Sequence, residues 1–133
     1  MQWNARTNGG FTDDEVEPWL PLDDPASCNV HDQKADRTSV LNLCRDLIAL
    51  RRARSELGRG GYASTEAPPG VWAWKRGQIS VAVNCSDLPV DIDVASGVVL
   101  IGTRRERDGR PVDGPLRLEP WEGVALAAND PDA

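Results

Sequence analysis

The stretch VWAWKRGQISVAVN, residues 71–84, decides the fold of the C-terminal half of the chain. Residues 71–75 form a β-type run, and Gly77 supplies a turn. Residues 79–84 then alternate between large and small side chains, which places Ile79, Val81 and Val83 on one face of a strand. The stretch therefore predicts two strands joined by a turn.

Shorter runs of the same kind follow this stretch, at residues 90–94, 98–101, 116–118 and 124–126. The run at 98–101 is apolar throughout, so we expect that strand to be buried on both sides. Turns rich in Gly, Pro and Asp separate the runs, a pattern typical of a small antiparallel sandwich or barrel. We expect a β domain over residues 61–127 and a polar tail over 128–133.

One amphipathic helix is predicted over residues 37–54, with Asp36 or Ser39 as its N-cap. Its apolar residues form two adjacent rows: Val40, Leu43, Leu47 and Leu50, and Leu41, Cys44 and Ile48. Gly58, Gly60 and Gly61 are expected to end the helix. Because the β domain can cover only part of so wide a stripe, the pattern indicates the end of a larger fold.

Residues 1–35 are predicted to be an irregular segment, with turn chemistry at TNGG, residues 7–10. Pro18, Pro21 and Pro25 interrupt any regular element. The large apolar residues of the segment indicate anchors that hold a loop against another surface; they are Trp3, Phe11, Trp19 and Leu20. A loop of this length in a compact domain is usually functional or disordered.

The composition argues against two classes of partner, nucleic acids and membranes. The chain has 133 residues and a formal net charge of −6, which disfavours a nucleic-acid partner because phosphates require a basic surface. No apolar run approaches the roughly 20 residues of a membrane helix, so we expect no membrane partner. Three cysteines at wide spacings predict reduced thiols and a cytoplasmic location.

Several motifs resemble the α-glucosidases of the α-amylase superfamily, glycoside hydrolase family 13. MQWN and GGFT, residues 1–4 and 9–12, resemble the MQW(D/N)…GF(S/T) segment of that family. Further segments are similar to its later motifs in the same order: PWLP at 18–21, NVHDQ at 29–33, SVLNLCRDLIALRR at 39–52, LGRGGY at 57–62 and LEPWEG at 118–123. The relatives include oligo-1,6-glucosidases and trehalose synthases.

The resemblance implies an α+β fragment: the last loop and helix of a (β/α)8 barrel, followed by an antiparallel β-sandwich called domain C. Residues 1–58 would end the catalytic barrel, and residues 59–133 would form the sandwich. Active sites of such barrels lie on the βα loops, so the loop residues Gln2, Trp3, Asn4 and Phe11 are implied to lie near the sugar.

No catalytic residue is expected in this chain. In the family, the nucleophile, the acid and a third aspartate precede the MQW segment, and their signatures are absent here. The acids of the loop match no catalytic motif and are expected to be solvated; they are Asp13, Asp14, Glu15 and Glu17. Met1 coincides with an internal methionine of the family's RTPMQW motif, which favours a truncated or split gene.

Three weaker signals have structural explanations beside functional ones. Cys28, His31 and Asp32 have a spacing that zinc could use, but a second ligand pair is missing, so no metal and no cofactor are predicted. Trp72 and Trp74 could stack a sugar, although aromatic residues in strands more often pack. Asn84 begins a glycosylation sequon.

The resulting hypothesis is a C-terminal fragment of an α-glucosidase-like enzyme, inactive alone, whose substrate would be an α-glucoside or oligosaccharide once it is joined to a barrel. Two alternatives stay open. One is a carbohydrate-binding or interaction β-module, and the other is half of a split enzyme with a partner chain that carries the rest of the barrel.

Overall fold

The computed structural model describes residues 2–129, so Met1 and the end of the predicted polar tail lie outside the described residues. The chain forms two compact units, one ending at Asp46 and the other beginning at Leu47. The boundary between these units lies inside a helix, α2, Val40–Ala53. The division into domains at residues 58 and 59 stays a prediction.

The first unit contains a short helix, α1, Val30–Ala35, where the sequence predicted an irregular segment. That part of the prediction is wrong. Asn29 supplies the reason, because its Oδ1 accepts the backbone N–H of Asp32 at 3.0 Å and so caps the helix. The prolines before Asn29 do not reach into the helix, which begins only after the last of them.

Helix α2 begins three residues later than predicted, and Ser39 is its cap. Ser39 Oγ accepts the N–H of Asn42 at 3.2 Å, and the Ser39 carbonyl accepts the N–H of Leu43 at 2.9 Å. Arg54 is extended and interrupts the helix, after which α3, Ser55–Arg59, continues. Gly58 therefore lies within α3, and Gly60 follows it, donating its N–H to the Glu56 carbonyl at 2.8 Å.

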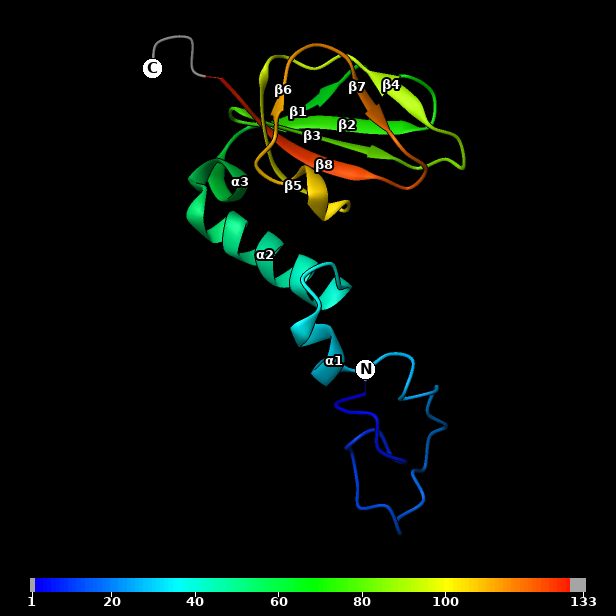
Figure 1. Cartoon of the computed structure of the whole chain (residues 1–133). Helices are drawn as coiled ribbons and strands as arrows, with labels where there is room; N and C mark the ends of the chain where they lie inside the picture. The colour runs from blue at the N-terminus through cyan, green and yellow to red at the C-terminus, as the bar shows by residue number, and fades with distance from the viewer. Residues whose placement is uncertain (1, 130–133) are drawn as a thin grey trace. The chain divides into compact units, whose positions relative to one another are not determined.

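The second unit is built from antiparallel strands (Figure 1). Their bounds are β1 Tyr62–Thr65, β2 Val71–Arg76, β3 Ile79–Asn84, β4 Val90–Ile92, β5 Gly97–Gly102, β6 Pro111–Val112, β7 Leu116–Leu118 and β8 Gly123–Ala128, with a 3-10 turn at Arg105–Arg107. Within the described residues, one sheet has the order β1-β2-β3-β8-β5-β6, and β4 pairs with β7 in a second sheet.

Both sheets contribute to one apolar core. Its buried members come from five strands: Ala82, Ile92, Val99, Leu116, Leu118, Val124 and Leu126. Figure 1 shows β4 and β7 on one side of the larger sheet, as a shared core requires. The predicted antiparallel β unit is therefore present in the structure.

One strand prediction is confirmed and another changes. Strand β3 pairs with β2 without a register shift, so Ile79, Val81 and Val83 share one face as predicted, and the core cluster receives Ala82 from the opposite face. In β5, Val99 and Ile101 are buried, whereas Val98 and Leu100 are only half-buried. Burial on both sides, expected for residues 98–101, holds for only part of that strand.

No helix within residues 2–129 is long and apolar enough to cross a membrane.

Candidate functional site

The N-terminal segment is closed by backbone hydrogen bonds. Gln2 forms a parallel bridge with Asn29, and the carbonyls of Gln2 and Trp3 accept the N–H groups of Val30 and His31 at 2.8 and 3.0 Å. Trp3 N–H donates to the Gly9 carbonyl at 2.7 Å. The residues that the resemblance places near the sugar thus begin a loop that is fastened to the start of α1.

Glycine is required at the turn of this loop. Gly9 and Gly10 both have left-handed φ angles, of 60° and 78°. A Cβ at Gly10 would lie 2.7 Å from Asn4 Nδ2, and one at Gly9 would lie 2.9 Å from Gln2 Cγ. The TNGG turn predicted from the sequence is present, and it packs directly on Gln2 and Asn4.

The four predicted loop residues fall into two groups. Asn4 and Phe11 line one shallow pocket of about 460 Å³, together with Arg6, Gly10, Thr12, Asp13 and Asp14. Gln2 does not line this pocket, and its Nε2 donates to the Asp23 carbonyl at 3.1 Å. Trp3 is also absent from the lining and is exposed.

Sequence reasoning missed Arg6 and Asn8. Arg6 is the cation of the shallow pocket, and its N–H donates to Asn4 Oδ1 at 3.0 Å. Asn8 is buried, and its Nδ2 donates to the carbonyls of Asp13 and Val16 at 2.6 and 2.8 Å. The sequence signal that could have identified Asn8 is its position directly before two glycines, because Asn side chains often bond to the backbone of such turns.

The large apolar residues of the segment remain uncovered in this chain. Trp19 is 91% exposed, and Phe11 and Leu20 are about half-exposed. Helix α2 shows the same feature: none of its residues is buried, and Val40, Leu47 and Ile48 are exposed. The anchors and much of the apolar stripe predicted from the sequence thus lack a covering surface among residues 2–129, although Leu41, Leu43 and Leu50 are half-buried.

Two of the three possible zinc ligands, Cys28 and Asp32, have other contacts. Cys28 Sγ accepts Gln33 Nε2 at 3.0 Å, and Asp32 Oδ2 accepts Asn29 Nδ2 at 2.7 Å. Within the described part of the chain, no three His, Cys, Asp or Glu side chains are grouped as metal ligands. All three cysteines are exposed and unpaired.

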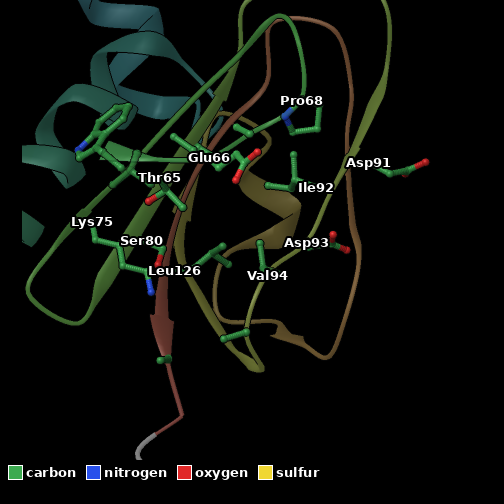
Figure 2. A pocket seen from close by; sticks show the side chains of 17 residues that line it. Thr65, Glu66, Pro68, Lys75, Ser80, Asp91, Ile92, Asp93, Val94 and Leu126 are labelled. Carbon is green, nitrogen blue, oxygen red and sulfur yellow. The ribbon is translucent and has the colours of Figure 1, made fainter. Parts of the chain in front are cut away.

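A larger pocket, of about 530 Å³, opens between the two sheets of the second unit (Figure 2). Ile92 and Val94 project into it, whereas Asp91 and Asp93 point away, as the alternation of an extended chain requires. Glu66 is the acid that faces the pocket. Because the neighbouring aspartates point outward, the pocket does not present the acid pair of a glycosidase.

Trp72 and Trp74 lie on the face of β2 that is turned away from the core. Their ring centroids are 4.5 Å apart and the rings are tilted by 40°. Trp72 is 57% exposed and Trp74 is half-buried, so the rings pack on each other and do not form a flat double platform.

Buried polar groups tie the last turn of the β unit to its neighbours. Glu122 is 1% exposed; its Oε1 lies 2.8 Å from Arg107 Nε, and its Oε2 accepts the N–H of Glu119 at 2.7 Å. Asn84 is fully buried and donates to the carbonyls of Leu88 and Glu119. Asn84 is therefore a structural residue in this fold, and its Nδ2, the atom that glycosylation would modify, is buried and hydrogen-bonded.

Comparison with known proteins agrees with the resemblance in the motifs. Residues 1–60 match the family model described as "Alpha amylase, catalytic domain". The probable oligo-1,6-glucosidase 2 of Bacillus subtilis is 40% identical over 63 residues, covering 47% of this chain and 11% of that protein. The glucan 1,6-α-glucosidase of Streptococcus dysgalactiae is 30% identical, covering 95% of this chain and 24% of that protein.

Solved structures give the same result. The trehalulose synthase MutB, seen in a crystal structure of its F164L mutant, matches 96% of this chain and 24% of its own with a TM-score of 0.83 and 25% identity. The isomaltulose synthase of Klebsiella sp. LX3 matches 95% of this chain with a TM-score of 0.82 and 27% identity. The chain belongs to the α-amylase family of glycoside hydrolases, glycoside hydrolase family 13. It spans no more than about a quarter of the length of these relatives.

Proposed function

We propose that this chain is the C-terminal part of an α-glucosidase-like enzyme that acts on α-glucosidic bonds in carbohydrate metabolism. In this assignment, residues 1–58 complete the catalytic barrel and residues 59–133 form domain C, a β-sandwich. The observation that carries the proposal is helix α2, which has a wide apolar stripe and no buried residue. A stripe of that kind requires a covering surface that a preceding barrel would provide.

The catalytic carboxylates would come from the barrel and not from this chain. Retaining glycosidases need a nucleophile and an acid about 5–5.5 Å apart. The acidic residues at positions 13–17 are exposed on the loop. None of them matches a catalytic motif of the family. The loop would instead shape the sugar site, with Asn4 and Phe11 lining its pocket beside Arg6.

Activity measurements test this assignment. The purified chain, assayed with p-nitrophenyl α-glucoside, maltose, isomaltose and trehalose, is expected to match the buffer blank, because loss of catalytic acids costs many orders of magnitude. A chimera that joins this chain to the barrel of the Bacillus relative, in place of the matching segment, is expected to turn over p-nitrophenyl α-glucoside. Turnover by the chain alone that survives repurification would contradict the proposal, as would a folded but inactive chimera.

A split enzyme is the second candidate, and the same uncovered stripe favours it. In that case a separate chain would supply the barrel and dock on α2. Co-purification distinguishes the two arrangements. If the enzyme is split, a barrel-bearing chain should co-purify with this one, and it should no longer do so when Leu47 and Ile48 are changed to Lys. The exposed, unpaired thiols support placing either form in the cytoplasm.

A further inference from the structure

The turn before β8 has an unusual backbone. Trp121 has a φ of 58°, and among residues 2–129 it is the one residue other than glycine with a left-handed φ. The turn runs from Glu119 to Glu122, whose N–H donates to the Glu119 carbonyl at 3.1 Å, with Pro120 at the second position. The third position of such a turn favours Gly or Asn, so a bulky Trp there is strained.

Buried groups hold this turn from inside. Glu122 accepts the N–H of Glu119 and pairs with Arg107, and Asn84 Nδ2 donates to the Glu119 carbonyl at 2.9 Å. None of these contacts uses the side chain of Trp121. The indole is therefore not needed to form the turn, although the turn fixes where the indole is placed.

The Trp121 ring is exposed but fixed in orientation. It is 63% exposed, and its Nε1–H donates to Asp87 Oδ1 at 2.9 Å. Asp87 lies on a loop held by Asn84 and Ser86, both of which donate to the Leu88 carbonyl. The second carboxylate oxygen of Asp87 makes no hydrogen bond within the described part of the chain. An open indole face thus has a hydrogen-bond acceptor at its edge.

We propose that Trp121 and Asp87 bind the pyranose ring of a neutral α-glucan, at a site separate from the loop pocket of residues 4–14. A pyranose has apolar C–H faces and hydroxyl groups around its rim. Its face can stack on the indole while a rim hydroxyl donates to Asp87, and a bond to a carboxylate is stronger than one between neutral groups. The choice of glucan rests on the proposed function, whereas the site itself rests on this geometry.

The turn offers a variant that separates folding from binding. Trp121→Gly removes the ring and suits the left-handed φ, so the chain is expected to fold at least as well as the wild type. Trp72→Ala is the matched control, because Trp72 is exposed to a similar degree but lies on β2, outside the turn at Glu119–Glu122. Asp87→Ala tests the acceptor alone.

Calorimetric titration of the full chain with isomaltotriose and with maltotriose tests the proposal. We expect weak, saturable binding with a Kd of about 1–10 mM, weakened about tenfold by Trp121→Gly and several-fold by Asp87→Ala. Trp72→Ala is expected to bind as the wild type does. Thermal unfolding of each variant confirms that loss of binding is not loss of fold.

Three results would overturn the proposal. They are no saturable binding of either sugar, loss of binding in Trp72→Ala with Trp121→Gly unaffected, and binding of tetramethylammonium chloride but not of sugar, which would indicate a cation site. The titration involves no turnover. A negative titration therefore contradicts the sugar site and does not bear on the proposed enzyme function. Likewise, activity of the chimera would support the enzyme function and would not be evidence for the sugar site.

Discussion

Glu122 illustrates how a single residue can hold a fold in a way that its sequence context does not reveal. The carboxylate is buried, with Arg107 at 2.8 Å and the Glu119 N–H at 2.7 Å. Acidic residues are seldom fully buried, so the motif LEPWEG alone suggests an exposed Glu. The partner Arg107 is distant in sequence, and no local pattern connects the two.

Removing Arg107 should therefore be costly. Arg107→Ala leaves the Glu122 carboxylate buried without its cation, and we expect a loss of about 3 kcal/mol in the free energy of unfolding. Urea denaturation measures this loss. Arg104→Ala is the control, because Arg104 pairs with Glu106 at 3.9 Å on the surface, where such pairs contribute about 0–1 kcal/mol. Equal effects of the two substitutions would contradict the role given to Arg107.

A second residue-scale prediction concerns Asp36. The Thr38 side chain donates to the Asp36 carboxylate at 2.7 Å and the Thr38 N–H donates at 2.8 Å, and together they lower the Asp36 pKa below its ordinary value. Stability from this group is present above the unfolded pKa and is lost as pH falls through the lowered folded pKa. Thr38→Ala should raise the Asp36 pKa, measured by carboxyl NMR titration, whereas Thr65→Ala on exposed β1 should not. An unchanged Asp36 titration in Thr38→Ala would contradict the assignment.

Elements with strong local patterns could be predicted from the sequence, and weakly patterned ones could not. The run at residues 79–84 and the run at 116–118 are strands with the predicted bounds. Strand β1 was missed because all four residues are exposed at the sheet edge and lack alternation. Strand β6 was missed because it has only two residues and begins with Pro111, a residue that is uncommon in strands.

The candidate site was predictable only in part, for a similar reason. The TNGG turn is local chemistry and was predicted from the sequence, and Asn4 and Phe11 do line one pocket. The separation of Gln2 and Trp3 from that pocket depends on pairing with Asn29 and α1, about 25 residues along the chain. Contacts between residues so far apart in the sequence cannot be predicted from the local pattern of side chains.

The elements should also differ in resistance to proteolysis. The segment before α2 leaves Phe11, Trp19 and Leu20 exposed, whereas the strands surround an apolar core. Limited digestion with chymotrypsin should cut first between Gly9 and Asp36, after Trp19 in particular, and leave a resistant fragment covering residues 60–128. Mass spectrometry of the early products identifies the sites. Early cleavage within β3 or β8, with the segment intact, would contradict this order.

At the scale of the whole chain, several large apolar side chains of helix α2 are exposed although the pattern of the helix predicts that they pack on another surface. Val40 is 66% exposed, and Leu47 and Ile48 are exposed on the same helix. Each such side chain contributes roughly 1.5–3 kcal/mol when fully buried, against a total stability of about 5–15 kcal/mol for a typical domain. The family relatives are about four times longer than this chain or more, which is consistent with a covering barrel outside it.

Association of the isolated chain tests this claim most directly. Size-exclusion chromatography with a hydrophobic dye should show dye binding and oligomers for the wild type, and less of both for the pair Leu47→Lys and Ile48→Lys. The pair Ala49→Lys and Ala53→Lys, on the same helix, adds equal charge without removing large apolar groups and should leave most of the dye binding. A monomeric wild type that binds no dye, and that the Leu47 and Ile48 substitutions unfold, would show that α2 already packs within this chain and would contradict the account.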